Sequence, residues 1–501
     1  MDRAIIDACA REIPNDAKLD GLDDRFVKLD EIPYDFNRRR MSVLVRDQRG
    51  HEHLITKGAV EEMLKISSRA QVAGEVVDLT DELRTRVMGE ARRLADDGMR
   101  VLAVAEVDDP DWGEKLDADD EHDMTLLGYL AFLDPPKDSS AAALRSLAEH
   151  GVTTKILTGD SDRVTCFICK QIGLPADNPL LGSDIEGMSD QELAERAEQT
   201  TVFAKLSPAQ KARVVSVLRA KGHTVGYMGD GVNDAAAMKE SDTGISVDDA
   251  VDIAKESADI ILLEKDLGVL DAGIIEGRRT YANMIKYIKM TASSNFGNIF
   301  SVLVASAFLP FLPMAAVHLL LLNLVYDICC TAIPWDNVDK ELLASPRKWD
   351  ASSIGKFMVW MGPTSSVFDI MTYALLFFVV CPAVCGGAWA SLDATGQALF
   401  VATFQAGWFV ESMWTQTTVI HLIRTEKIPL IQSHASAPVY LGTILGGIFV
   451  TLIPFSGIGS ALGLSPLPGF YFGWLALIIG CYMLLETVVK KLYIRHYGEL
   501  L

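Results

Sequence analysis

Six long apolar runs in the C-terminal part of the chain constrain its fold more than any other feature. A helix needs roughly 20 mostly apolar residues to cross the hydrocarbon core of a bilayer. Such runs occur at about 290–310, 314–334, 356–380, 398–420, 436–455 and 470–489. Because unpaired backbone groups are very costly in lipid, each run is expected to be helical. Residues 281–501 are therefore predicted to form an all-α bundle of six transmembrane helices.

Basic residues are confined to alternate connections between these runs. The connections near 310–313, 381–397 and 456–469 contain no Lys or Arg. The remaining connections and the tail carry many: Arg278, Arg279, Lys286, Lys289, Lys340, Arg347, Lys348, Lys356, Arg424, Lys427, Lys490, Lys491 and Arg495. Lys and Arg accumulate on the cytoplasmic side of membrane proteins. We therefore expect a multi-pass protein with both termini of this chain, and its whole soluble part, in the cytoplasm.

Polar residues inside the first two runs are candidate ligands for a transported ion. Asn295 and Asn298 lie three residues apart, and Asn323 and Asp327 lie four apart, so each pair shares a helix face. Amide and carboxylate oxygens that converge between helices suit a hard divalent cation. The alternative is ordinary helix–helix hydrogen bonding. Three acidic residues in or near later runs are expected to be structural or interfacial: Asp369, Glu411 and Glu486.

The residues before the first run predict two soluble domains. Within 124–280, short apolar segments alternate with helical ones, which is typical of a doubly wound parallel sheet. The strands are expected at Leu126–Phe132, Thr153–Leu157, Val202–Ala204 and Thr224–Met228. Residues 1–123 are expected to form a smaller α+β domain. The net charge of −21, concentrated in acidic soluble segments, argues against nucleic acid as a partner.

The polar residues that follow the predicted parallel strands indicate phosphoryl transfer. They are Thr158, Gly159 and Asp160 after one strand, Lys205 after the next, and Asp230, Asn233 and Asp234 after a third. The carboxyl ends of parallel strands meet at one edge of a sheet. There a hydroxyl and backbone amides can hold phosphoryl oxygens, a lysine can neutralise their charge, and two aspartates can bind Mg²⁺.

A carboxylate nucleophile is not found among these residues. An aspartyl-phosphate mechanism needs a carboxylate that attacks the γ-phosphate, expected in an Asp-Lys-Thr-Gly sequence that residues 1–501 do not contain. Asp134 is the nearest candidate at a strand end. Two prolines follow it and cannot donate amide protons to a phosphate, so Asp134 is not expected to replace the nucleophile.

A second candidate site, for a nucleotide, lies within residues 1–123. Its members are an aromatic residue, basic residues and a glycine: Phe36, Arg38, Lys57, Gly58 and Arg100. An aromatic face can stack on adenine, and basic side chains can contact phosphates. Basic residues at strand edges are usually only solvated. The interpretation as a nucleotide site therefore depends on the order of the motifs along the chain.

Taken together, these motifs resemble the C-terminal half of P-type cation-transporting ATPases. The resemblance covers essentially all 501 residues and rests on Phe36–Ser42, Lys57–Ala59, Gly98–Arg100, Phe132–Lys137, Thr158–Asp160, Gly229–Asp234 and Tyr281–Met290. Four further segments are closest to the bacterial magnesium-importing class: Ser293–Asn298, Asn323–Asp327, Ala332–Asp339 and Phe404–Phe409. The resemblance implies ATP-driven import of a divalent cation, most closely Mg²⁺, across the bacterial inner membrane.

The resemblance also implies an architecture and cofactors. The soluble part would be an incomplete haloacid-dehalogenase-like doubly wound sheet with an inserted α+β nucleotide-binding domain. Residues 1–123 would be most of the nucleotide-binding domain, 124–280 the phosphorylation domain without its first strand, and 281–501 the last six transmembrane helices. ATP and Mg²⁺ would be the cofactors, and the transported divalent cation and the lipid bilayer the partners.

Residue roles follow from the same resemblance. Phe36 would stack on adenine, with Lys57 and Arg100 near the phosphates. Thr158 and Asp160 would position the phosphate or nucleotide, and Lys205 would contact the phosphoryl group. Asp230 and Asp234 would bind catalytic Mg²⁺. The transported ion would be held by Asn295, Asn298, Asn323 and Asp327.

The family pattern also includes parts that are not found in residues 1–501. These are an actuator domain with a Thr-Gly-Glu loop, four earlier membrane spans and the phosphorylated aspartate. The isolated chain is therefore expected to be inactive, and a separate chain could supply the missing half. The alternatives are a non-enzymatic nucleotide-binding membrane protein, a P-type ATPase for another cation such as Ca²⁺, and a membrane-anchored phosphatase.

Overall fold

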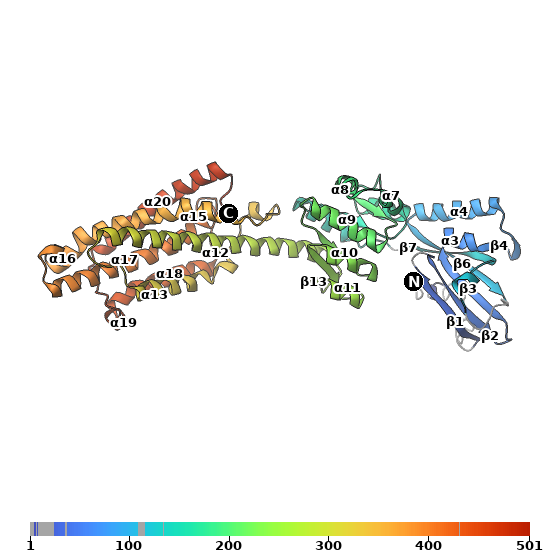
Figure 1. The fold of residues 1–501 in the computed structure, drawn as a ribbon, viewed down its shortest axis with the longest axis horizontal. Helices are drawn as coiled ribbons and strands as arrows, with labels where there is room; N and C mark the ends of the chain where they lie inside the picture. Colours follow the sequence, from blue (N-terminus) through green and yellow to red (C-terminus); the bar gives the residue numbers. More distant parts are fainter. Residues whose placement is uncertain are drawn as a thin grey trace. The chain divides into compact units, whose positions relative to one another are not determined.

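The computed structural model describes residues 5, 6, 8, 25–35, 38–108, 116–133, 135–429 and 431–501 (Figure 1). The chain divides into two compact units. Unit 1 comprises Met1–Arg145 and Thr153–Val269, and unit 2 comprises Ser146–Val152 and Leu270–Leu501.

Unit 1 contains a seven-stranded mixed sheet with the order β1-β2-β3-β6-β7-β4-β5. Its strands are β1 (Phe26–Asp35), β2 (Arg40–Asp47), β3 (Glu52–Ala59), β4 (Ser67–Val72), β5 (Glu75–Asp78), β6 (Met99–Asp108) and β7 (Met124–Leu133). Helices α3 (Val60–Ile66) and α4 (Asp81–Asp96) pack against the sheet. The apolar core that results includes Leu54, Met63 and Ala103, which are fully buried.

The strand β7 corrects one expectation from the sequence. Leu126–Phe132 was predicted in the parallel sheet, but β7 pairs with β6 in antiparallel fashion and with β4 in parallel fashion. Both β6 and β7 contain 10 residues, so the two form a long ladder. By contrast, β8 contains only 2 residues, so it could form only a short ladder with β7. An apolar run identifies a buried strand but not its partner, which is why the sequence did not reveal this pairing.

The remainder of unit 1 contains two three-stranded parallel sheets, with orders β8-β10-β9 and β11-β12-β13. The strands are β8 (Ile156–Leu157), β9 (Leu180–Leu181), β10 (Val202–Ala204), β11 (Gly226–Met228), β12 (Thr243–Val247) and β13 (Ile260–Leu262). The intervening helices are α5 (Ser140–Glu149, which ends in unit 2), α6 (Asp162–Gln171), α7 (Gly182–Glu186), α8 (Asp190–Gln199), α9 (Pro208–Ala220), α10 (Ala235–Glu240) and α11 (Asp252–Ser257). The predicted strand–helix alternation is thus present, but the described strands form two sheets rather than one. Both β8 and β11 are edge strands.

Unit 2 is helical. Its longer helices are α12 (Leu267–Phe308, which begins in unit 1), α13 (Ala316–Cys330), α15 (Ala351–Leu375), α17 (Ala394–Ile423), α18 (Ala437–Leu452) and α20 (Tyr471–Tyr497). Shorter helices are α14 (Lys340–Leu343), α16 (Cys381–Cys385) and α19 (Gly457–Ala461). In the core, α17 contributes the fully buried side chains of Phe404 and Trp408, and α20 contributes Tyr471.

Within the described part of the chain, four helical segments are long and apolar enough to cross a membrane. They are Ala316–Trp335, Ala351–Ser391, Ala437–Phe455 and Tyr471–Tyr497. Helices α12 and α17 cover the other two predicted runs. They carry polar residues that lower their mean hydropathy, including Asn295 and Asn298 on α12 and Gln405 and Glu411 on α17.

Candidate functional site

The loop after β8 contains the predicted Thr158, Gly159 and Asp160. The Thr158 amide donates to the Phe203 carbonyl at 3.0 Å, which joins the loop to β10. The Asp160 amide donates to Thr158 Oγ1 at 3.1 Å, so the hydroxyl is held by the loop's own backbone. The Arg100 guanidinium of β6 forms an ion pair with the Asp160 carboxylate. This contact joins a predicted nucleotide ligand to a predicted phosphate-site residue.

Lys205 lies directly beside that loop. Its amide donates to the Asp160 carbonyl at 2.9 Å, and its Nζ lies 3.1 Å from Oδ1 of Asp162. The backbone of Lys205 is left-handed, with φ of 54°. A long side chain rarely adopts this conformation, which costs about 1–3 kcal/mol. The structure therefore brings Thr158, Asp160 and Lys205 together as the sequence predicted, and it holds Lys205 in a strained conformation.

The second loop follows β11 and contains Asp230, Asn233 and Asp234. Lys211 Nζ lies 2.8 Å from Asp234 Oδ1, and Tyr227 Oη donates to the same oxygen at 2.8 Å. The Asp230 carboxylate is exposed and accepts from Lys265 Nζ at 2.6 Å. Asn233 is half-buried in the turn between them. Each candidate Mg²⁺ ligand is thus paired with a lysine.

Gly229 allows this loop to fold tightly. A Cβ atom at Gly229 would lie 2.5 Å from the Asp234 Cβ and 2.6 Å from its Cγ. No side chain fits at such distances. The glycine therefore lets the Asp234 carboxylate fold back over the end of β11, where Tyr227 reaches it.

Helix α9 links the two loops. It begins shortly after Lys205, where Ser207 caps it: the Gln210 amide donates to Ser207 Oγ at 3.3 Å, and Gln210 Oε1 accepts from the Ser207 amide at 2.9 Å. Lys211 lies in the first turn and is buried. The helix therefore begins next to Lys205, and its Lys211 forms the ion pair with Asp234. The set of carboxylates, hydroxyl and lysines fits an Mg²⁺–phosphate ligand, which binds acidic and basic groups at once.

The nucleotide candidates are only partly brought together. Phe36 lies outside the described residues, as does Asp134. Arg38 donates to both carboxylate oxygens of Glu121 at 2.7 Å, and Arg40 donates to the same group at 2.5 Å. Glu121 also accepts from Ser42 Oγ at 2.7 Å. Burial alone would raise the pKa of Glu121, but the hydrogen bonds from Arg38, Ser42 and Arg40 outweigh burial and lower it.

Gly58 and Lys57 lie on β3 opposite β2. A Cβ atom on Gly58 would lie 2.5 Å from the Arg40 Cβ and 2.7 Å from the Arg39 carbonyl. The two strands therefore approach closely at the register pair Arg40–Gly58. This explains the glycine through packing, whether or not a nucleotide contacts it.

The four candidate transport residues lie on α12 and α13. Asn298 is half-buried, and its Oδ1 accepts from Gln416 Nε2 at 3.3 Å. Asn323 is half-buried, whereas Asn295 and Asp327 are exposed. Among the described residues, no hydrogen bond or ion pair joins the pair on α12 to the pair on α13. Their convergence on one ion therefore stays a prediction.

Two of the acidic residues in the predicted spans lie buried without a partner. Glu411 on α17 and Glu486 on α20 are fully buried, and neither has a hydrogen-bond partner for either oxygen among the described residues. Asp369 differs, because it accepts from Ser301 Oγ at 2.6 Å and from Trp408 Nε1 at 2.8 Å. A structural or interfacial role was expected for all three, and among the described residues only Asp369 shows structural pairing. An unpaired charge in a span usually marks a functional position.

A small polar cavity lies within unit 2 close to these groups. Its volume is about 20 Å³, and its lining includes Asn298, Asp369 and Gln416. That is room for about one water molecule. The cavity brings one predicted ion ligand, Asn298, next to polar groups of α15 and α17 that the sequence analysis had not linked to it.

Lys211 and Glu121 are the functional-site residues that sequence reasoning missed. Lys211 shares a helix face with the buried Val214, Val215 and Leu218. A lysine on an otherwise apolar face is a signal that could have revealed a buried ion pair. Glu121 offers no comparable signal, because it occurs in an acidic segment between β6 and β7.

Comparison with known proteins gives matches at both ends of the chain. Residues 1–139 match the model of the P-type ATPase cytoplasmic domain N. Residues 311–492 match the model of the cation transporting ATPase C-terminus. The first match includes β1–β7, and the second includes α13 to α19 and most of α20.

Several curated proteins are similar over longer stretches. The magnesium-transporting ATPase, P-type 1, of Salmonella typhimurium is 49% identical over 502 residues, which is 100% of this chain and 53% of that protein. The Escherichia coli protein of the same name is 49% identical over 494 residues, 99% of this chain and 54% of that protein. A calcium-transporting ATPase of Bacillus subtilis is 32% identical over 381 residues, 73% of this chain and 42% of that protein. The chain spans about half the length of the first two relatives.

Proposed function

Because the chain belongs to the P-type cation-transporting ATPase family, we propose that it forms part of an ATP-driven pump that moves Mg²⁺ across the bacterial inner membrane. One observation carries the proposal: 49% identity to a magnesium-transporting ATPase over 100% of this chain. The calcium-transporting relative reaches 32% identity over 73% of the chain, which favours Mg²⁺ over Ca²⁺. Import is the direction that the sequence resemblance implies.

In this proposal the loops of unit 1 hold the Mg²⁺–phosphate part of the reaction. When bound, Mg²⁺ would supply positive charge that bridges the phosphate to the carboxylates of Asp230 and Asp234. Lys205 would neutralise phosphoryl oxygens, and Thr158 Oγ1 with the Asp160 amide would orient them. The ion pair between Lys265 and Asp230 must break for Asp230 to bind a cation. Both side chains are about half exposed, so breaking this pair costs little free energy. Residues 124–280 would then act as a haloacid-dehalogenase-like phosphorylation domain.

Residues 1–123 would supply the nucleotide site. Lys57 and Arg100 would contact phosphates, and Phe36 would stack on the base. Arg100 supports this assignment because its ion pair with Asp160 places it beside the phosphate loop. Arg38 neutralises the buried Glu121 carboxylate. Its contribution to nucleotide binding would therefore be indirect, by stabilising the fold around the site.

Residues 281–501 would supply six transmembrane helices, with α12 and α17 added to the four apolar segments. Asn295 and Asp327 are exposed on faces of α12 and α13. A carboxylate facing lipid is costly. We therefore infer that these faces line an ion path or are covered by further protein in the complete pump, and that Asn295, Asn298, Asn323 and Asp327 contact the ion. Both termini of this chain would be cytoplasmic.

A transport assay tests the proposal. The chain is expressed together with the parts that complete the pump, in bacteria that lack other Mg²⁺ uptake systems and grow only with added Mg²⁺. Growth at low Mg²⁺ is expected with the unaltered gene and is expected to disappear with Asp327→Asn. A pump that restores Ca²⁺ extrusion instead of Mg²⁺-limited growth would overturn the assignment of the ion.

Nucleotide binding is tested separately on the purified chain. A fluorescent ATP analogue is expected to bind residues 1–501 in detergent, and Arg100→Ala is expected to weaken binding more than about tenfold, as loss of a charged phosphate contact would. Arg92→Ala, an exposed arginine on α4, is the matched control. If the two variants bind equally, Arg100 has no role at the nucleotide site. No phosphoenzyme is expected from residues 1–501 alone, because they contain no Asp-Lys-Thr-Gly.

A further inference from the structure

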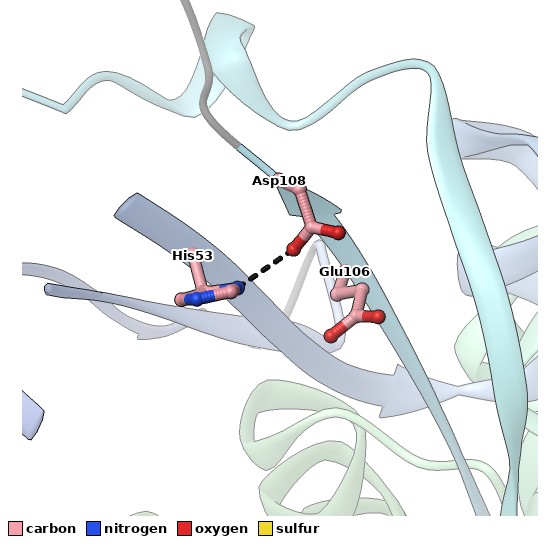
Figure 2. Close-up of side chains that lie close together, drawn as sticks. All are labelled: His53, Glu106 and Asp108. Carbon is pink, nitrogen blue, oxygen red and sulfur yellow. Dashed lines mark hydrogen bonds and ion pairs between the residues drawn. The ribbon is translucent and has the colours of Figure 1, made fainter. Parts of the chain in front are cut away.

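Three metal-ligating side chains lie together on the seven-stranded sheet. They are His53 on β3 and Glu106 and Asp108 on β6. One ligand atom from each lies within 4.8 Å of the others. Figure 2 shows these three side chains beside one another on neighbouring strands, with the His53–Asp108 hydrogen bond drawn.

The strand register builds this cluster. His53 is directly opposite Asp108 in the antiparallel ladder, and Glu106 is two residues before Asp108. Side chains two apart on a strand share one face, and residues directly opposite have Cβ atoms about 4.5–5.5 Å apart. The proximity therefore follows from the pairing of β3 with β6 and not from a chance side-chain conformation.

The cluster contains two carboxylates and one imidazole. His53 Nδ1 lies 2.7 Å from Asp108 Oδ1. Among the described residues, no Lys or Arg pairs with Glu106 or Asp108, and the Glu106 carboxylate makes no hydrogen bond at all. Burial, and then the Asp108 carboxylate, raise the pKa of Glu106. A bound cation would relieve this repulsion.

We propose that His53, Glu106 and Asp108 bind a divalent transition-metal ion of the zinc type on the sheet of unit 1. An imidazole with two carboxylates is a ligand set typical of such ions. Mg²⁺ is the wrong ion for this set, because it prefers an all-oxygen octahedron and keeps several waters. Water would complete the coordination.

The site requires only side-chain movement to receive an ion. Ligands of a tetrahedral zinc ion lie about 2.0–2.2 Å from the metal. The ion would replace the proton shared between His53 and Asp108 and draw in Glu106. The side chain of Asp108 is 64% exposed, so it is free to turn. The strands themselves need not move.

The test compares Zn²⁺ binding by the full chain and its variants. Purified chain in detergent, with its thiols blocked by N-ethylmaleimide, is equilibrated with Zn²⁺ in the presence of excess Mg²⁺, and bound zinc is measured after dialysis. The wild-type chain is expected to retain one more Zn²⁺ than His53→Gln and Asp108→Asn. Glu106→Gln is expected to weaken this site more than about tenfold.

Two features keep the test decisive. Glu106→Gln removes no hydrogen bond found among the described residues, so it reports on the metal even if His53→Gln disturbs the strand pairing. His122→Gln is the matched control, because His122 Nδ1 also contacts a carboxylate, that of Asp123 at 3.2 Å, but His122 belongs to no group of three metal-ligating side chains among the described residues. Equal zinc stoichiometry and affinity in wild type, His53→Gln and Glu106→Gln would overturn the proposal. The His53–Asp108 contact would then be only an ion pair between two strands.

Discussion

The Lys211 ammonium lies 2.8 Å from Oδ1 of Asp234, and only 9% and 14% of the two side chains are exposed. Tyr227 donates to the same oxygen from β11. Burial, followed by the neighbouring Asp234 carboxylate, raises the pKa of Tyr227, so its hydroxyl stays protonated and continues to donate. The carboxylate that we propose as an Mg²⁺ ligand is thus oriented by donors from two separate elements before any ion arrives.

Lys211→Met is expected to destabilise the chain. It removes the cation from a largely buried carboxylate, and hydrogen bonds to charged groups are worth about 1.5–3 kcal/mol. We expect a loss of about 2 kcal/mol in the free energy of unfolding, measured by urea denaturation in detergent. Lys239→Met, an exposed lysine on the adjacent α10, is the matched control. Equal stability of the two variants would show that Asp234 does not depend on Lys211.

The loops of the phosphate site could be predicted from the sequence because each follows a short apolar strand. Val202–Ala204 was predicted as a strand with the bounds that β10 has, and Met228 was predicted as the last residue of the strand that became β11. Runs of buried apolar residues that end at Gly or Ser-Pro define such elements locally. Thr158, Asp160 and Lys205 were therefore placed correctly next to one another.

The partners of the charged residues could not be predicted. Arg38 and Glu121 are 83 residues apart, and Asp230 and Lys265 are 35 apart. Such contacts depend on how strands pair across the sheet. The same limit explains the misplaced strand β7. Its sequence indicates a buried strand but not the strands with which it pairs. It also explains why Glu411 could not be distinguished from the well-paired Asp369.

The Glu121 cluster predicts an acid-sensitive step in stability. The pKa of Glu121 lies below its ordinary value of 4.5 in the folded chain. As the pH falls, the unfolded chain therefore takes up this proton first, and the stabilising contribution is lost on passing from about pH 4.5 to below the folded pKa. Above the unfolded pKa, the contribution is fully present.

Glu121→Gln tests this step. The variant is expected to be less stable than wild type near neutral pH and to lose less stability than wild type on acidification. Urea midpoints measured between about pH 7 and pH 2.5 give both quantities. Glu75→Gln, on the exposed strand β5, is the control and should follow the wild-type profile. Parallel pH profiles for wild type and Glu121→Gln would contradict the assignment.

Gly229→Ala is expected to displace Asp234. The new Cβ would lie 2.5 Å from the Asp234 Cβ, so the loop must shift and the Lys211 contact must lengthen. Overpacking of this kind costs about 1–3 kcal/mol. The matched control is Gly226→Ala on β11, where the nearest atom, Ile245 Cδ1, would lie at 3.8 Å. Thermal unfolding with and without Mg²⁺ reports both stability and ion binding, and a Gly229→Ala variant that keeps both at the level of the control would be evidence against the tight turn.

Glu411→Met is expected to stabilise the chain and to weaken its interaction with Mg²⁺. A buried carboxylate without partners costs about 1–3 kcal/mol, which an apolar side chain of similar length avoids. Thermal stability in detergent should therefore rise, while any stabilisation by added Mg²⁺ should diminish. Asp369→Asn is the contrasting variant, because it disturbs hydrogen bonds from Ser301 and Trp408 and is expected to lower stability. A fall in stability for Glu411→Met would instead reveal a contact of Glu411 that stabilises the fold.

Asp336→Asn is expected to be the most destabilising of these changes. The Asp336 carboxylate accepts from Lys286 Nζ at 2.8 Å and from Arg424 Nε at 2.7 Å, and these side chains are 1–3% exposed. Neutralising Asp336 leaves two buried cations facing each other, and breaking a buried pair in this way costs about 3–5 kcal/mol. Unfolding by sodium dodecyl sulfate, followed by tryptophan fluorescence, measures the loss. Asp393→Asn is the control, because Asp393 caps α17 at an exposed position and asparagine caps equally well.

If the combined variant Lys286→Met, Asp336→Leu, Arg424→Met recovers stability relative to Asp336→Asn, the cost arises from the uncompensated charges. If it is no more stable than Asp336→Asn, the hydrogen bonds that the combined variant also removes, to the Asn337 carbonyl and from the Ser436 amide, are worth at least as much as the uncompensated charges cost.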